Sequence, residues 1–319
     1  MAKFYYGGQA VIEGVMMRGR THMAVAVRAA DDQIVLYDEP LSPQLNRYAT
    51  WPLLRGIVLL WESMVLGMRS LRFSAAVAAA ASPPAGAAPP DGAAYMAQAS
   101  QGVRAAMALS LLFGLGLFFV LPLLLVGWAD HYIAAPWASN LLEGAIRLSF
   151  LLGYLLLVGR VPEIQRVFGY HGAEHKTINA YEAGRPLTPS EVQRCTMIHP
   201  RCGTTFLLIV VVVSIGVFVL LGRPPLFWRL LSRIVLVPGV ASVAYEAIRW
   251  AAGHYGNRLV RLVLAPGLAL QRLTTRAPDD RMVECGIAAL QRVLGVDGVL
   301  AAATPAPAWA PTGSEVAAG

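Results

Sequence analysis

The residues best suited to chemistry lie in one polar stretch between long apolar runs, from His171 to Glu182. Because an α-helix turns about 100° per residue, His175 and Glu182 would lie within about 40° of His171 on one helix face. Two imidazoles at positions i and i+4 can bind one divalent ion, most commonly zinc. Glu174 would lie about 60° to one side, where it could act as a general base. The pattern H-x-x-E-H also occurs in inverzincins. The alternative interpretation is a solvated helix face that happens to carry two histidines.

A third ligand is needed, since two histidines alone hold an ion weakly. Glu182 would lie about 10 Å along the helix axis from His175, so only a bent helix would bring it to the ion. His199 and Cys202 end the polar stretch, and both residue types bind transition metals. We therefore predict a divalent ion, zinc by preference, held by His171, His175 and a residue outside their helix. The candidate ligands are His199, Cys202 and Glu182, with His199 preferred. In the alternative interpretation, residues 199–202 form a basic membrane-anchoring turn before a helix cap.

The composition is that of a membrane protein. Of the 319 residues, 56% are hydrophobic and 14% are charged, whereas soluble proteins carry about 25% charged residues. The formal net charge of +7 comes from scattered arginines without a patch interleaved with aromatic residues, so we predict no nucleic-acid partner. The three cysteines, Cys195, Cys202 and Cys285, lack the spacing of a disulfide framework, and we expect free thiols in a reducing compartment.

We predict an α-helical multi-pass membrane protein with about four spans, an amphipathic interfacial helix and a small N-terminal β-element. Runs of about 20 apolar residues predict the spans, at 105–128, 141–159, 203–221 and 230–250. The remaining segments are predicted as a flexible linker at 82–104, a cytoplasmic motif segment at 160–202, cytoplasmic helices at 253–300 and a disordered tail at 301–319.

Residues 1–50 and 51–81 precede the spans. Two β-rich runs within 1–50 flank a pair of aspartates, which predicts a hairpin that ends near Pro40. Residues 51–81 have the composition of one long helix. Its charged residues Arg55, Glu62 and Arg69 recur every seven positions and would form a polar stripe, which is typical of a helix at the membrane surface or packed on a bundle.

Basic residues predict the orientation in the membrane. Six arginines and lysines lie between the second and third predicted spans, and none lies between the first and second. Four spans with the polar stretch and both termini in the cytoplasm satisfy this bias. Arg223 and Arg229, between the third and fourth spans, depart from it.

Three stretches together resemble the YqhQ family of bacterial membrane proteins. They are GGQAVIEGVMMR from Gly7, YHGAEHK from Tyr170 and HPRCGT from His199. The family is one of unknown function, described as predicted metal-dependent enzymes. The resemblance implies an integral protein of the bacterial cytoplasmic membrane with the polar stretch as its functional centre, and implies no known substrate. It adds five motif residues to the candidate site, which are Gln9, Glu13, Arg18, Lys176 and Arg201. The first stretch is interpreted either as a loop bringing Gln9 or Glu13 to the histidines or as an ordinary strand.

Two functions from different classes fit these features. The first is a metal-dependent hydrolase at the cytoplasmic membrane face, with Glu174 as general base and lipids or membrane-protein segments as substrates. The second is a non-catalytic scaffold or assembly factor, in which the motifs form a structural or docking site. Transport is disfavoured because no predicted span centre carries a suitable ionisable residue. The lipid bilayer is the expected partner in both, and a homo-oligomer is compatible with both.

Overall fold

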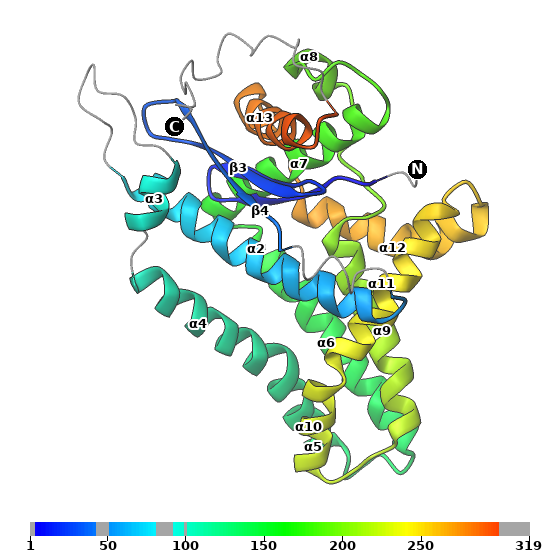
Figure 1. The fold of residues 1–319 in the computed structure, drawn as a ribbon. Helices are drawn as coiled ribbons and strands as arrows, with labels where there is room; N and C mark the ends of the chain where they lie inside the picture. Colours follow the sequence, from blue (N-terminus) through cyan, green and yellow to red (C-terminus); the bar gives the residue numbers. More distant parts are fainter. Residues whose placement is uncertain (1–3, 43–50, 81–91, 99–100, 300–319) are drawn as a thin grey trace.

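A computed structural model describes residues 4–42, 51–80, 92–98 and 101–299 of the chain (Figure 1). The protein is mostly helical and contains one antiparallel sheet with strand order β1-β2-β3-β4. The strands are β1 (Gly7–Val11), β2 (Gly14–Arg18), β3 (His22–Arg28) and β4 (Ile34–Pro40). The predicted hairpin is therefore confirmed as β3 and β4. The motif that begins at Gly7 is extended, as in the strand interpretation, but forms two strands of a second hairpin, β1 and β2, and not one strand.

The helices follow the sheet along the chain. They are α2 (Leu54–Ala79), α3 (Gly92–Gln98), α4 (Gln101–Leu115), the π-helical turn η1 (Gly116–Val120), α5 (Leu121–Ala129), α6 (Pro136–Val158), α7 (Pro162–Glu182), α8 (Pro189–Gln193), α9 (Gly203–Leu221), α10 (Leu226–Val235), α11 (Val237–Gly253), α12 (Arg258–Thr274) and α13 (Asp280–Val296). α13 begins at an aspartate cap, since the Asp279 side chain accepts a hydrogen bond from Met282 N at 2.8 Å.

The sheet is covered on both faces because successive side chains of a strand point to opposite sides. On one face Val15, Met17 and Ala24 pack against α7 and α13. On the other face Met16 and Val25 pack against α2 and α3. Figure 1 shows the strands between α13 and α7 on one side and α2 on the other. The N-terminal β-element, the motif helix α7 and the C-terminal helix α13 thus share one core, although the sequence analysis assigns them to separate segments.

Among the described residues, three helical segments are long and apolar enough to cross a membrane, namely Ala105–Ala129, Pro136–Val158 and Gly203–Leu221. A fourth span exists if α10 and α11, bent by 44° at their junction, are counted together. The second span begins five residues earlier than predicted, because Pro136 occupies the first helical position and favours a helix start. The early start places the polar residues of α6 deeper in the helix than the sequence analysis assumed.

The polar stripe of α2 has partners within the protein. Glu62 accepts a hydrogen bond from Arg18 Nη2 of β2 at 2.7 Å. Arg69 donates to Glu39 of β4 at 2.9 Å. Arg55 Nε donates to Glu246 of α11 at 2.6 Å. The stripe therefore joins α2 to the sheet and to α11, as expected for a helix packed on the bundle, and α2 is not among the candidate spans.

The predicted linker is wrong for 92–98 and 101–104, which are helical. The Ala/Pro-rich composition of this segment predicts a linker, but Tyr95 is buried in the core beside α2 and anchors the helix there. The rest of the linker and the predicted disordered tail at 301–319 lie outside the described residues. All three cysteines are free, as expected.

Candidate metal centre

The motif helix α7 carries the two histidines and lies close to its neighbours because glycines remove side chains at the points of approach. At Gly172 a Cβ atom would lie 2.2 Å from the Arg276 carbonyl oxygen. At Gly8 of β1 a Cβ atom would lie 2.8 Å from Cγ of Glu174. The glycine between His171 and Ala173 and the glycines of the N-terminal motif therefore permit the packing that surrounds the site.

His171, His175 and Cys202 form one cluster of metal-ligating side chains. One ligand atom from each lies within 4.8 Å of the others. His171 Nε2 lies 3.4 Å from Cys202 Sγ. The two imidazole rings have centroids 4.4 Å apart. The residue outside α7 that lies at the histidine pair is therefore Cys202, whereas the preferred candidate was His199.

Backbone carbonyls orient both imidazoles. His171 Nδ1 lies 2.9 Å from Thr274 O at the end of α12. His175 Nδ1 lies 2.5 Å from Met197 O. Because a carbonyl oxygen only accepts hydrogen bonds, each Nδ1 carries a proton. The lone pair of each imidazole, when it binds a metal, is therefore on Nε2. Metal-binding histidines are typically held in this way by a carbonyl or carboxylate on their other nitrogen.

Glu174 lies beside the cluster with its side chain almost fully buried. Its Oε2 is 3.6 Å from His175 Nε2 and 3.9 Å from His171 Nε2. A carboxylate at this position is too far for strong hydrogen bonds to either ring. It is close enough to share a water molecule or an ion with them, as the H-x-x-E-H spacing predicts.

Cys202 is held at the start of α9 by a buried glutamine. Its sulfur accepts a hydrogen bond from Thr204 N at 3.5 Å, so the thiol caps the helix. Gln271 of α12 binds the loop before it, with Oε1 3.0 Å from His199 N and Nε2 2.7 Å from His199 O. The same Nε2 donates to Thr205 Oγ1 at 2.9 Å. α12 therefore sets the position of both Cys202 and His171.

The donor types suit zinc, and one ligand pair has the spacing of a zinc site while all pairs lie within 4.8 Å. Tetrahedral zinc bonds of about 2.0–2.3 Å to nitrogen and sulfur place ligand atoms about 3.3–3.8 Å apart. The 3.4 Å separation of His171 Nε2 from Cys202 Sγ falls in this range. Zinc binds both imidazole nitrogen and thiolate sulfur, and three protein ligands would leave a fourth position for water or substrate.

His199 and Glu182, both predicted as ligands, form a second group beside the cluster. Glu182 Oε2 lies 3.7 Å from His199 Nε2, and Arg201 forms an ion pair with the same carboxylate. Burial raises the pKa of Glu182, but hydrogen bonds from His199 and Arg201 more than offset this and leave the pKa below its usual value. The Arg201 guanidinium also lies 4.2 Å from the centroid of the Tyr5 ring. Glu182 lies two helical turns beyond His175, so its carboxylate is away from the ligand cluster and pairs with Arg201.

The remaining motif residues hold elements together outside the ligand cluster. Glu13 accepts hydrogen bonds from Arg166 and, at 3.2 Å, from Tyr170 of α7. Gln9 lies against Gly67 of α2, where a Cβ atom would be 2.7 Å from its Oε1. The structure therefore differs from the loop interpretation, because Glu13 and Gln9 contact Arg166, Tyr170 and Gly67 and not the histidines.

Two basic motif residues also bind outside the cluster. Arg18 pairs with Glu62 of α2. Lys176 Nζ donates to the Gln193 carbonyl, and burial lowers the pKa of this lysine. Both side chains connect elements of the core, and neither contributes an atom to the cluster of potential ligands among the described residues.

Sequence reasoning missed three groups that shape the centre. The carbonyls of Thr274 and Met197 carry no side-chain signal, so only the fold reveals them. Gln271 had a weak signal, since it is an amide in an otherwise apolar and basic helix.

Comparison with known proteins places the chain in a family. Residues 51–296 match the model of a family described as "Protein of unknown function (DUF1385)". The chain is also 33% identical to the "Uncharacterized protein YqhQ" of Bacillus subtilis (strain 168) over 297 residues, which cover 92% of this chain and 93% of that protein. The chain belongs to this YqhQ family. The resemblance drawn from the three motifs is thereby confirmed. No solved structure matches the chain.

Proposed function

We propose that this YqhQ-family protein is an integral membrane enzyme with a zinc-dependent hydrolase centre at the cytoplasmic membrane face. One observation carries the proposal. Two histidines with carbonyl-bound Nδ1 atoms, one helix-capping cysteine and one carboxylate meet within a few ångströms. A structural helix face would not require both imidazoles to be fixed with Nε2 directed at a thiol and a carboxylate.

The residues have distinct roles in this proposal. His171, His175 and Cys202 would hold the ion. Zinc, when bound, would act as a Lewis acid and lower the pKa of a water molecule. Glu174 would accept the proton from that water, and the distances of 3.6 and 3.9 Å from its Oε2 to the two histidine Nε2 atoms support this role. Burial of this carboxylate keeps competing water away and favours proton transfer within the site.

The charge distribution supports insertion with this site in the cytoplasm. The segment between the second and third candidate spans carries six basic residues, against none between the first and second. Arg223 and Arg229, which follow the third candidate span, oppose this orientation. However, both form ion pairs with Asp130 at the same end of the bundle, which reduces their weight as topology signals. Lipids or segments of membrane proteins are the substrates that such a site would reach.

A scaffold function is the alternative, and one observation favours it. The candidate ligands are strongly buried, with His175 1% and Cys202 6% exposed. A zinc ion enclosed there would join α7, α9 and the end of α12, which is the behaviour of a structural site.

Elemental analysis with matched variants tests the metal centre. Protein purified without chelator should carry about one zinc ion per chain, and His171→Ala and Cys202→Ser should lose it. Cys195→Ser and His254→Ala serve as controls, because these side chains lie outside the cluster, and both should retain the metal. Zinc-free wild-type protein that also regains no zinc on incubation would contradict the proposal.

Glu174→Gln separates the hydrolase from the scaffold. This variant removes the proton acceptor and keeps the ligands, so the hydrolase proposal expects retained zinc and thermal stability but lost turnover. Proteoliposomes made from bacterial lipid extract, with and without membrane-protein fragments, can be compared by mass spectrometry for wild type and variant. Products that form equally with both proteins would exclude Glu174 as the base. Retained zinc without any turnover by wild type would favour the scaffold.

A further inference from the structure

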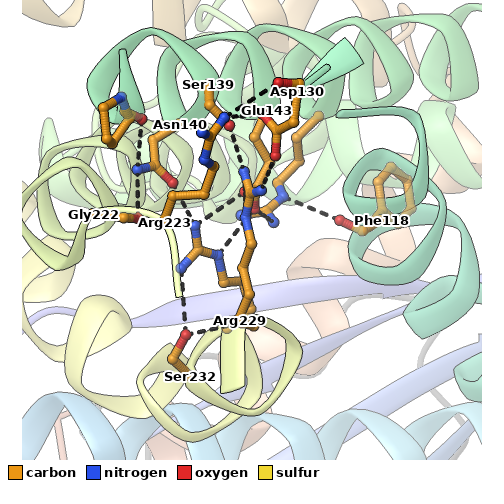
Figure 2. Close-up of polar contacts among 12 residues, drawn as sticks. Phe118, Asp130, Ser139, Asn140, Glu143, Gly222, Arg223, Arg229 and Ser232 are labelled. Atoms are coloured by element: carbon orange, nitrogen blue, oxygen red, sulfur yellow. Dashed lines mark hydrogen bonds and ion pairs between the residues drawn. The ribbon is translucent and has the colours of Figure 1, made fainter. Parts of the chain in front are cut away.

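A buried cluster of charges lies inside the helix bundle, at the end away from the sheet (Figure 2). Its centre is Glu143 of α6, whose carboxylate accepts hydrogen bonds of 2.9–3.0 Å from three arginines, namely Arg147, Arg229 and Arg233. Because α6 begins at Pro136, Arg147 is residue 12 of this 23-residue helix. An ionisable residue therefore does lie at a span centre, contrary to the sequence-based expectation. The charges pair with one another and connect α6 to α10 within the bundle.

The two edges of the sheet differ in how they are protected. At the β4 edge α3 lies against the strand, where a Cβ atom at Gly92 would overlap Leu36 O, and the strand carries Asp38 and Glu39. Cover and charge are the usual means by which proteins prevent another strand from pairing with an edge. β1 has the sequence GGQAV, which contains neither charge nor proline, and Gly8 is exposed. The β1 edge is therefore open to a further strand.

The hydrogen bonds of the sheet identify the backbone groups that face this open edge. Two bonds of 2.8 Å mark the ends of the ladder between β2 and β3, from Arg28 N to Glu13 O and from Gly19 N to His22 O. Because bonding direction alternates along a strand, the odd-numbered residues of β2 bond to β3 and its even-numbered residues bond to β1. Those even-numbered residues pair with the odd-numbered residues of β1. Gly8 and Ala10 therefore direct their N–H and C=O groups to the open edge, where these groups have no hydrogen-bond partner within the described residues.

The open edge of β1 lies against the carboxylate beside the metal centre. A Cβ atom at Gly8 would be 2.8 Å from Glu174 Cγ, so the strand and this side chain are in contact. Glu174 Oε2 in turn lies 3.6 Å from His175 Nε2. Neighbouring strands lie about 4.8 Å apart, so a strand added to β1 would pass beside Glu174. The large exposed side chains at the two ends of β1, Tyr5 and Ile12, are uncharged.

We propose that the open edge of β1 binds an extended peptide as an added strand and presents its backbone to the metal centre. The inference rests on the proposed hydrolase and makes its substrate an extended segment of a membrane protein, in place of a lipid. Backbone pairing with Gly8 and Ala10 would supply the affinity. Gly7 and Gly8 carry no side chains, and glycine in a strand often marks a place where another backbone approaches closely. The uncharged edge favours a segment with uncharged side chains.

The reaction at this edge would be hydrolysis of a peptide bond. Water supplies the hydroxyl group that joins the carbonyl carbon while the C–N bond breaks. Glu174 takes the proton from the water and passes it to the leaving nitrogen, so water is the only other reactant consumed. The strand would hold the peptide carbonyl beside this carboxylate, which is the contribution of β1 to the reaction.

Amide hydrogen exchange of the full-length protein in detergent tests the proposal at single residues. The probe is a pool of acetylated and amidated peptides of about nine residues, with random Val, Thr, Ala and Ser. It is added to Glu174→Gln, so that no peptide is cleaved. Exchange of the Gly8 and Ala10 N–H groups should slow about a hundredfold at a hundredfold excess of peptide over its apparent Kd. The N–H groups of Gln9 and Val11 face β2 and should not change.

Two variants at one residue separate the backbone donor from the side chain. Ala10→Pro, made in the same background, removes an N–H that faces the open edge and keeps the ladder with β2, a position at which edge strands tolerate proline. It should bind zinc as before and lose the protection of the Gly8 N–H by the peptide pool. Ala10→Ser retains the N–H and should keep this protection. A pool that is N-methylated at every residue cannot donate hydrogen bonds and guards against misfolding of the proline variant, since it should protect neither amide in the unaltered strand.

The outcomes separate this inference from the hydrolase on which it rests. Protection of Gly8 and Ala10 alone, given only by the unmethylated pool, supports the strand site, and it does so even if the protein binds no zinc and the hydrolase fails. No protection, equal slowing along all of β1, or the same slowing with the methylated pool would overturn the strand site. A zinc-loaded protein that cleaves lipids and gives no protection with the peptide pool would overturn it and leave the hydrolase standing.

Discussion

Replacing Gly172 by alanine perturbs the candidate metal centre without touching a ligand. At this residue α7 passes directly over the segment after α12, and a Cβ atom would lie 2.2 Å from Arg276 O. Carbon and oxygen atoms in contact are normally about 3.3 Å apart, so the segment must move by about 1 Å. That segment directly follows Thr274, the last residue of α12, whose carbonyl accepts a hydrogen bond from His171 Nδ1 at 2.9 Å. The substitution should therefore weaken the hydrogen bond that orients this histidine.

The expected magnitude follows from two opposing terms. Alanine is favoured over glycine in a helix interior by about 1 kcal/mol. Overpacking a close contact costs about 1–3 kcal/mol, and here the contacted atom belongs to the backbone and yields poorly. We expect Gly172→Ala to lose about 1–2 kcal/mol of unfolding free energy. Loss of a partner that orients a metal ligand typically lowers metal affinity about 10–100-fold, and we expect a zinc Kd raised by that factor.

Competition against a chromophoric chelator measures the zinc Kd, and thermal unfolding reports stability. Gly216→Ala in α9 is the matched control, because a Cβ atom there meets nothing within 4 Å. It should bind zinc as wild type does and gain about 1 kcal/mol in stability. A folded Gly172→Ala protein with wild-type zinc affinity would refute the role of the Thr274 carbonyl in holding His171.

Three further substitutions test other parts of the structure. Gln271→Leu should cost about 2–3 kcal/mol and weaken zinc binding, because it leaves buried backbone groups unpaired in the loop that carries Cys202; denaturant titration and chelator competition measure the two effects. Glu143→Gln should destabilise the bundle by about 3–5 kcal/mol, since it leaves buried arginines without their shared carboxylate; a wild-type unfolding midpoint would contradict this. The hydrogen bond from Arg166 lowers the pKa of Glu13 from 4.5, so its contribution to stability should be present above pH 4.5 and lost as the pH falls through the depressed pKa. Glu13→Gln should flatten that part of the curve of stability against pH.

Much of the fold follows from local patterns. Long apolar runs predict three of the candidate spans because their composition alone decides the assignment. The fourth span is harder, since the residues Pro238-Gly239 interrupt the run and the chain bends there by 44°. Only the second hairpin of the sheet could be predicted from the sequence, because the first hairpin is short and rich in glycine.

Only part of the candidate site could likewise be predicted from local patterns. The spacing of His171 and His175 predicts that both face one point, since that relation is set within a single helix. The choice of Cys202 over His199 depends on how residues 183–202 fold back, and no local pattern specifies that path. The hydrogen bonds of Gln271 fix this path. Its amide binds the backbone N–H and carbonyl of His199, and Cys202, three residues later, then lies against His171.

α9 connects the candidate metal centre with the buried charges around Glu143. It begins at Cys202, whose thiol caps it beside the metal centre, and near its other end the Phe218 ring centroid lies 4.1 Å from the guanidinium carbon of Arg233, which pairs with Glu143. Nineteen residues at 1.5 Å each make this helix about 28 Å long, close to the thickness of a bilayer core. If α9 spans the membrane, the metal centre and these charges lie toward opposite leaflets, and an effect of Glu143→Gln on zinc binding would have to pass through α9 itself.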